Sequence, residues 1–341
     1  MKLALGLGYW SAGPPAGAVE QVAAAEDLGF DSMWSAEAYG SDALTPLAWW
    51  GAATERIGLG TSICQISART PAAMAMAAMT MDHLSGGRFR LGLGASGPQV
   101  VEGWYGQPYP KPLARTREYV EIIRRILARD IPVEYFGEHY QMPFKGGSDL
   151  GKPLKSTVHP VRNNIPIYLG AEGPKNVAMT AEIADGWLPL FFAPKDNQWY
   201  ADLLAEGFAR EGARQSAETF DVAAVVSVVP NADIEKAADA IRPMLALYAG
   251  GMGAKEANFH LNVFSRMGYE DACIKIQNLY LAGDKKAAIA AVPTSMVEDV
   301  ALIGPPEKIR DDLEKWNESC VDTLVISGPP SLLELMAGVV A

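Results

Sequence analysis

Short apolar segments alternate along this chain with longer amphipathic segments. The short segments have nearly continuous apolar residues, which is typical of strands buried on both faces, and the longer ones repeat apolar positions at helical spacing. This pattern predicts strands at residues 2–8, 30–36, 57–63, 88–94, 166–170, 186–192, 220–229 and 321–327. It predicts helices at residues 14–29, 44–54, 71–83, 113–129, 175–184, 197–214 and 306–319.

Strands that alternate in this way with helices predict an α/β fold, the (β/α)8 TIM barrel, because parallel neighbours need a crossover connection. A doubly wound parallel sheet is the alternative, although no dinucleotide-binding fingerprint follows the first strand. Two insertions interrupt the alternation. One, rich in Gly, Pro and polar residues, precedes strand 5 (131–164), and the other, a run of helical segments, lies between strands 7 and 8 (233–300). We expect both to be excursions from a single domain that covers residues 1–341.

Composition narrows the classes of function. Of the 341 residues, 49% are hydrophobic, which allows a large core, and the net charge of −11 argues against nucleic acid as a partner. No apolar run reaches the length of a membrane span, and the first residues enter a strand pattern without the features of a signal peptide. We therefore expect a cytoplasmic protein. The cysteines and histidines are scattered without metal-ligand or disulfide spacing, so no metal site is predicted.

Two glycine-rich loops each follow a predicted strand. No large side chain fills the first, Gly94–Gly97, and the second, Gly170–Asn176, leads directly into a helix. Glycine allows the backbone to approach a ligand closely, and the free N–H groups of a helix N-terminus suit a phosphate. Each loop taken alone can be an ordinary strand-to-helix connection. Together, the two loops predict one ligand that is held from several sides.

The predicted strand ends carry small, polar and aromatic residues but few reactive groups. They contain no Ser-His-Asp set, no Cys-His pair and no cluster of metal-binding carboxylates, so the chemistry is expected to come from a cofactor. Glu37 either contacts a ring system or acts as an acid, and the alternative is a surface carboxylate that caps a turn. Aromatic residues predict the substrate pocket: Tyr9, Trp10, Phe191 and Phe192.

Several short motifs resemble the bacterial luciferase-like superfamily. They are Trp-Ser-Ala-Glu-Ala-Tyr at 34–39, Gly-Thr-Ser-Ile at 60–63, Leu-Ser-Gly-Gly-Arg-Phe at 84–89, the stretch 92–99 and Gly-Ala-Glu-Gly-Pro-Lys at 170–175. The chain is most similar to the branch that uses the deazaflavin coenzyme F420, which includes methylenetetrahydromethanopterin reductase and F420-dependent dehydrogenases. The similarity runs from Lys2 to about Ser327.

The resemblance implies a barrel that holds a flat cofactor ring at the C-terminal ends of its strands. It implies hydride transfer between F420 and an organic small molecule. An FMN-dependent monooxygenase and a flavin- or deazaflavin-binding protein without turnover are the alternatives, because the motifs distinguish F420 from FMN less sharply. A non-proline cis peptide at Ser62–Ile63 is implied behind the ring. The positions implied to bind the cofactor are Glu37, Ser62, Ile63, Ser96, Gly97, Gly170, Ala171, Glu172, Gly173, Pro174, Lys175 and Asn176.

One position departs from the family pattern. Many F420-dependent relatives place a histidine directly after the carboxylate that corresponds to Glu37, where it donates or accepts a proton beside the hydride. This chain has Ala38 there. Glu37 and Tyr39 are therefore the candidates for the catalytic role, unless the reaction needs no such residue. By analogy with the family, we also expect a homodimer formed through the second and third helices.

Overall fold

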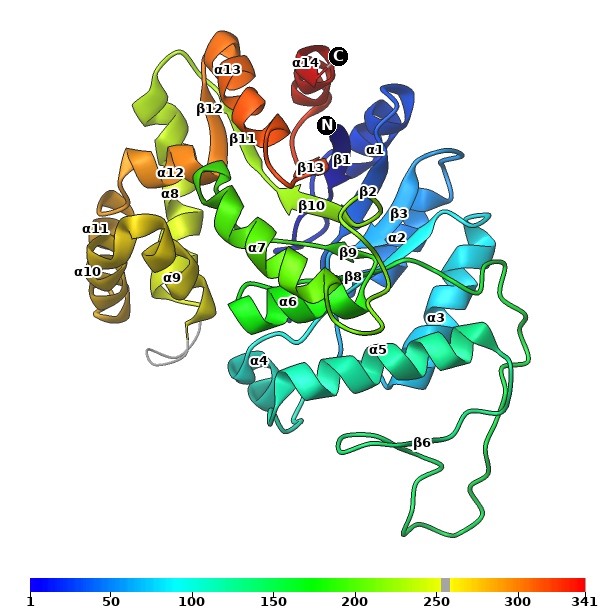
Figure 1. Cartoon of the computed structure of the whole chain (residues 1–341). Coiled ribbons are helices and arrows are strands. Elements are labelled where there is room, and N and C mark those ends of the chain that lie inside the picture. The colour runs from blue at the N-terminus through cyan, green and yellow to red at the C-terminus, as the bar shows by residue number, and fades with distance from the viewer. Residues whose placement is uncertain (253–257, 341) are drawn as a thin grey trace.

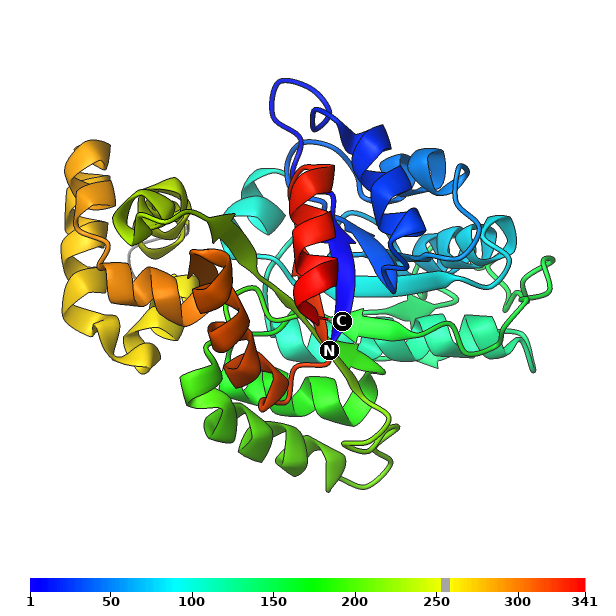
Figure 2. The same ribbon diagram turned by 90° about the horizontal axis from the view of Figure 1, so that it is seen from above.

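The computed structural model describes residues 1–252 and 258–340, and it confirms the expected (β/α)8 barrel (Figures 1 and 2). The barrel strands run parallel in the order β1-β2-β3-β5-β8-β9-β10-β13, and β13 pairs again with β1, which closes the cylinder. Their bounds are β1 (Lys2–Gly6), β2 (Ser32–Ser35), β3 (Gly58–Thr61), β5 (Phe89–Gly94), β8 (Ile167–Leu169), β9 (Gly186–Trp187), β10 (Asp221–Val225) and β13 (Thr323–Ile326).

Helices cover the outside of this barrel. They are α1 (Ala18–Asp27), α2 (Leu44–Gly51), α3 (Pro71–Leu84), α5 (Pro112–Ala128), α6 (Pro174–Ile183), α7 (Asn197–Phe208), α13 (Pro306–Asn317) and α14 (Pro330–Val340). The last of these, which the sequence pattern did not predict, packs against α1. None of the helices within the described residues is long and apolar enough to cross a membrane.

Two large aromatic side chains fill the interior of the barrel because glycines face them from neighbouring strands. The rings of Trp34 and Tyr168 meet edge to face, with 5.2 Å between their centroids. A Cβ on Gly60 would lie 2.3 Å from the Trp34 ring, and a Cβ on Gly186 would lie 2.2 Å from the Tyr168 ring. Since real Cβ contacts are never this short, both glycines are required by packing.

The structure corrects two of the predicted strands. The strand expected at 186–192 ends at Trp187, and Pro189, which lacks a backbone N–H, follows closely. The prediction of a single strand at 220–229 is wrong. It breaks into β10 and β11 (Ser227–Pro230), and β11 leaves the barrel to pair with β12 (Ala301–Gly304) in a separate two-stranded sheet. The sequence pattern had not shown β12 as a strand, because its partner is distant in the chain.

The segment between β11 and β12, which we call the excursion, is helical as predicted. Its elements are α8 (Ile234–Gly250), α9 (Phe259–Phe264), the π-helical turn η2 (Ser265–Tyr269), α10 (Glu270–Leu281), α11 (Lys285–Ala290) and α12 (Thr294–Val300). These elements bury an apolar cluster of their own, which includes Leu245, Phe264 and Ile276. Figure 1 shows the excursion on one side of the barrel.

The insertion at 131–164 forms an extended arm on another side of the barrel (Figure 1). A short hairpin of β6 (Tyr135–Phe136) and β7 (Gln141–Met142) is its main regular structure. The C-terminal end of the arm, where the chain returns to the barrel, is attached to α3. The guanidinium of Arg162 pairs there with the fully buried carboxylate of Asp82, and His83 Nε2 lies 2.8 Å from the carbonyl oxygen of His159.

Candidate functional site

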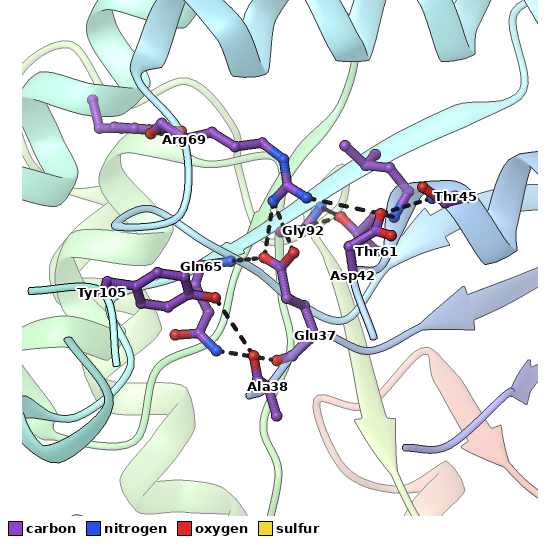
Figure 3. Close-up of polar contacts among 11 residues, drawn as sticks. Glu37, Ala38, Asp42, Thr45, Thr61, Gln65, Arg69, Gly92 and Tyr105 are labelled. Atoms are coloured by element: carbon purple, nitrogen blue, oxygen red, sulfur yellow. Dashed lines mark hydrogen bonds and ion pairs between the residues drawn. The ribbon is translucent and has the colours of Figure 1, made fainter. Parts of the chain in front are cut away.

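The C-terminal ends of the barrel strands meet at one end of the cylinder, which is where such barrels bind ligands. Glu37 follows β2 at this end, and only 6% of it is exposed. Its carboxylate accepts the backbone N–H of Gln65 at 2.9 Å and lies 2.8 Å from Nη1 of Arg69, as Figure 3 shows. A buried carboxylate needs such partners, so these contacts fix the Glu37 side chain in one position.

Gln65 and Arg69 lie on the segment that follows β3. Gln65 belongs to β4 (Cys64–Gln65), which pairs with β5. Burial lowers the pKa of Arg69, but the hydrogen bonds to Glu37 and the charge of that carboxylate outweigh this effect, so the pKa is raised overall. The buried Oε1 of Gln65 has no hydrogen-bond partner among the described residues. An N–H donor of a bound heterocycle would satisfy this oxygen.

The peptide bond between Ser62 and Ile63 is cis, as the resemblance implied. The Ile63 side chain contacts two glycines of neighbouring strand ends. A Cβ on Gly94 would lie 2.7 Å from Cδ1 of Ile63, and a Cβ on Gly170 would lie 3.4 Å from its Cγ2. Gly94 thus makes room for the Ile63 side chain at the mouth of the barrel, where it offers an apolar surface to a flat ring.

The first glycine-rich loop connects β5 to the short helix α4 (Pro98–Gly103). Ser96 has a left-handed backbone with φ of 59°, and Gly97 caps the helix without a side-chain hydrogen bond. The Tyr109 hydroxyl donates a 2.8 Å hydrogen bond to the Ser96 carbonyl oxygen. This contact holds the loop in place, so its backbone is ordered before any ligand binds.

The second glycine-rich loop leads from β8 into α6. Pro174 is the first helical residue, Gly173 caps the helix without a side-chain hydrogen bond, and the Ala171 carbonyl oxygen accepts the indole N–H of Trp187 at 2.8 Å. Lys175 lines a groove of about 390 Å³ beside this turn, together with Leu113, Ala114, Arg117, Met179, Glu206 and Arg210. The helix N-terminus and the lysine together suit a phosphate group.

Of the four aromatic residues expected in the substrate pocket, Tyr9 and Trp10 are accessible to solvent, whereas Phe191 and Phe192 are buried. Tyr9 is 54% exposed and Trp10 is partly exposed, both after β1. Phe191 is buried but lies against the excursion. Phe192 is a correction, because it is 1% exposed and lies in the core with its ring near three others: Trp187, Tyr200 and Trp316. Phe191 joins the apolar cluster of the excursion, whereas Phe192 joins the core of the barrel.

Tyr39, the second catalytic candidate, lies near the hydroxyls of Tyr9 and Tyr248. It is 60% exposed, and its ring centroid is 6.5 Å from that of Trp104. Glu37, in contrast, is engaged by Arg69. The structure therefore brings Glu37 together with Gln65 and Arg69 and leaves Tyr39 largely exposed.

The structure adds a residue that the sequence analysis had not singled out. His260, in α9 of the excursion, has its Nδ1 2.7 Å from Oε1 of Glu172 in the second glycine-rich loop. Arg266 donates a 3.0 Å hydrogen bond to the backbone carbonyl oxygen of Glu172. Both contacts join segments about ninety residues apart, which no local sequence pattern indicates.

Metal ligands are not gathered at this mouth. In the described ranges 1–252 and 258–340, no group of three or more His, Cys, Asp or Glu side chains is placed to hold a metal ion. The mouth instead offers a buried amide oxygen that can accept a hydrogen bond, a helix N-terminus whose N–H groups can donate, and an apolar surface. This combination suits a flat heterocycle that carries a phosphate.

The similarity of this chain to known proteins extends over the whole barrel. A model of the luciferase-like monooxygenase family matches residues 5–323. A protein of Mycobacterium tuberculosis, provisionally named a coenzyme F420-dependent oxidoreductase, is 54% identical over 329 residues, which are 96% of this chain and 95% of that protein. The 5,10-methylenetetrahydromethanopterin reductase of Archaeoglobus fulgidus is 31% identical over 313 residues, or 90% of this chain and 87% of the reductase.

A solved structure shows the same architecture. The coenzyme F420-dependent tetrahydromethanopterin reductase of Methanopyrus kandleri superposes with a TM-score of 0.80 and 26% sequence identity, and the match covers 99% of this chain and 98% of the reductase. The match therefore includes both glycine-rich loops and the excursion as well as the strands.

Proposed function

The chain belongs to the luciferase-like monooxygenase family, and we propose that it is a coenzyme F420-dependent oxidoreductase that transfers hydride to or from an organic substrate. The observation that carries this proposal is the 54% identity, over nearly the full length of both chains, to a protein named for F420. The mouth of the barrel supports it with the apolar surface of Ile63, the buried amide oxygen of Gln65 and the turn at Lys175.

Each of these features has a defined task in the proposed complex. When bound, F420 supplies a ring carbon that gives or takes a hydride. Ile63 supports the ring, while Ser62, Ser96 and Gly97 supply backbone around it. Gln65 Oε1 accepts an N–H of the ring, and Arg69 keeps Glu37 in place. The loop from Gly170 to Asn176 binds the phosphate through backbone N–H groups and the charge of Lys175.

A direct test is a binding titration of the purified protein with F420 and, in parallel, with FMN, followed by fluorescence. We expect F420 to bind and FMN to bind at least tenfold more weakly. Binding of FMN alone would move the assignment to an oxygen-dependent monooxygenase. Tight binding of F420 without turnover on any substrate would indicate a binding protein instead.

The phosphate loop has its own test. A Cβ on Gly173 meets nothing within 4 Å, and its φ of −79° suits any residue, so Gly173→Leu should fold normally. The leucine would occupy the approach to the α6 N-terminus, and we expect F420 affinity to fall by at least tenfold. Gly338→Leu, at an exposed and equally open position on α14, is the control and should leave F420 binding unchanged without loss of stability. Unchanged F420 affinity in Gly173→Leu would mean that the phosphate binds elsewhere.

The homodimer remains a proposal. Large apolar side chains are exposed on the two helices that the resemblance implies for the interface: Trp49 on α2 is 79% exposed, and Met76 and Leu84 on α3 are 62% and 74% exposed. A second copy would cover this surface. Sedimentation of the wild-type chain should give twice the mass of one chain, and Trp49→Glu should give a single chain. The cytoplasmic location expected from the sequence likewise remains a prediction.

A further inference from the structure

A row of four side chains joins the excursion to two loops at the mouth of the barrel. Tyr9 lies three residues beyond β1, and Glu172 lies three residues beyond β8. Between them, Tyr248 of α8 lies beside Tyr9. The pKa of Tyr248 is raised, mainly by burial and to a smaller extent by the Tyr9 hydroxyl. The rings of Tyr248 and His260 meet edge to face at 4.8 Å, and His260 contacts Glu172.

The strand order shows what this row spans. From β1 to β8 there are four steps around the barrel in either direction, through β2, β3 and β5 or through β13, β10 and β9. Tyr9 and Glu172 therefore follow opposite strands. The excursion leaves after β10 and returns before β13, so the row covers that half of the mouth. The other half carries Glu37 and the cis peptide at Ser62–Ile63, and a ligand on Ile63 would lie opposite the row.

The neighbours of His260 hold its imidazole in one orientation. Its side chain is 22% exposed, and that of Glu172 is 15% exposed. The ring of Phe191 approaches edge to face at 6.0 Å, which restricts rotation of the imidazole. Because a carboxylate only accepts hydrogen bonds, Glu172 requires the proton on Nδ1 of His260. The neutral ring then has Nε2 as an acceptor, and the protonated ring has Nε2–H as a donor.

We propose that His260, positioned by Glu172, is the catalytic residue that donates a proton to the substrate as hydride is transferred, and accepts it in the reverse direction. The substrate is accordingly a carbonyl compound or the corresponding alcohol. This inference rests on the function proposed above. It supplies from the excursion the acid–base group that Ala38 cannot provide at the end of β2.

The step balances for a carbonyl substrate. The carbonyl carbon gains the hydride as a new C–H bond, and the electron pair of the C=O double bond moves to the oxygen. The oxygen takes the proton from Nε2–H of His260, which becomes neutral, and the product is an alcohol. Solvent then returns a proton to His260 and takes up the proton that the reduced cofactor has lost. The substrate is reduced and the cofactor is oxidised.

The other candidates are less well placed for this transfer. Both carboxylate oxygens of Glu37 are engaged, by Arg69 and by the backbone of Gln65, so the carboxylate is held as an ion pair. Tyr39 is 60% exposed with its ring beside that of Trp104, so its hydroxyl is less fixed in position than the imidazole of His260. The titratable and charged groups around His260 are Glu172, Arg266 and the hydroxyl of Tyr248, and the hydroxyls of Tyr9 and Tyr39 lie next to that of Tyr248.

The first experiment tests whether His260 faces the bound cofactor. The chain has only four histidines, so NMR spectra of protein with isotope-labelled histidine contain few side-chain signals, and His260→Gln identifies the relevant one. We expect F420 to shift the His260 signal, and to leave the signals of His83 and His139 unchanged. Failure of F420 to bind would contradict the proposed function. Binding that leaves the His260 signal unmoved would overturn this inference alone.

The second experiment tests proton transfer. Reduced F420 is offered with a panel of aliphatic and aromatic ketones and aldehydes, and its oxidation is followed by absorbance. His260→Ala should lower kcat by about 10²–10⁴-fold, remove one limb of the pH profile and regain activity with added imidazole. Its affinity for F420 should stay close to that of wild type. His83→Ala, on the outer helix α3, is the control.

The results that would overturn the inference are specific. Unchanged kcat in His260→Ala would do so, and so would a loss that imidazole does not restore, since that pattern indicates a structural role. Absence of turnover on every carbonyl by the wild-type enzyme would refute the assigned substrate class. Glu172→Gln should reduce kcat less than His260→Ala, because the amide oxygen can still accept the Nδ1–H of the imidazole while the negative charge beside it is lost.

Discussion

Replacement of Arg69 by methionine tests whether the Glu37 carboxylate is held as the site requires. The Glu37 side chain is 4% exposed, and the substitution leaves it with the backbone N–H of Gln65 as its remaining partner. Removing one partner of a buried ion pair destabilises a protein by about 3–5 kcal/mol. Because 22% of the Arg69 side chain is exposed, water can replace part of the lost contact. We therefore expect about 3 kcal/mol.

The assay is urea unfolding of four proteins: wild type, Arg69→Met, Glu37→Gln and the double variant. Glutamine keeps an oxygen that can accept the Gln65 N–H, and it needs no counter-charge. The double variant should therefore be more stable than Arg69→Met, with a coupling energy of about 1–3 kcal/mol. Lys236→Met is the control, because its pair with Asp233 is on the surface and should contribute less than about 1 kcal/mol.

Two outcomes would refute this reasoning. A loss below about 1 kcal/mol in Arg69→Met would place the pair among ordinary surface ion pairs. Additive effects in the double variant would show that Glu37 and Arg69 do not stabilise each other. If the reasoning holds, Arg69→Met should also weaken F420 binding under conditions in which it remains folded, because Glu37 and the segment around Gln65 would lose their fixed positions.

Two further predictions concern the barrel itself. A Cβ on Gly92 would lie 1.8 Å from the Thr61 carbonyl oxygen, so Gly92→Ala should destabilise the fold by about 4 kcal/mol or more, measured by thermal unfolding, whereas Gly103→Ala meets nothing within 4 Å. Burial raises the pKa of Asp185, but Arg124 and the hydrogen bonds from Ile167 and Gln215 together outweigh this, so the pKa is lowered overall. A carboxyl with a lowered folded-state pKa stabilises above its unfolded pKa of about 3.9 and loses that contribution as the pH falls. Asp185→Asn should therefore flatten the loss of stability below about pH 4, and an unchanged slope would contradict this.

Local pattern was enough to predict the barrel. Each strand and helix has its own periodicity, and the rule that parallel strands need crossovers then fixes the architecture. The glycine-rich loops could also be predicted from the sequence, because the backbone conformations of glycine and proline are typical of turns. The family motifs added the cis peptide at Ser62–Ile63, which the structure contains.

Other features depend on contacts that a local pattern does not contain. The strand β12 exists because β11 lies beside it, about seventy residues away in the chain. The approach of His260 to Glu172 has the same origin. Phe191 and Phe192 have the same chemistry and adjacent positions, and only the packing around Trp187 decides that Phe192 joins the core. Sequence reasoning could name both phenylalanines but could not separate them.

The small sheet of β11 and β12 has an evolutionary consequence. It brings the two ends of the excursion together, and the N–H of Asn231 donates to the carbonyl oxygen of Gly304 at 2.9 Å. An inserted segment whose ends already touch can be exchanged between homologues without moving the strands that it leaves and rejoins. The barrel half that we propose to hold the cofactor ring could thus stay constant while the inserted half was replaced. New substrates would then be acquired by cassette exchange, and chimeras joined at these two strands are the natural starting point for redesign.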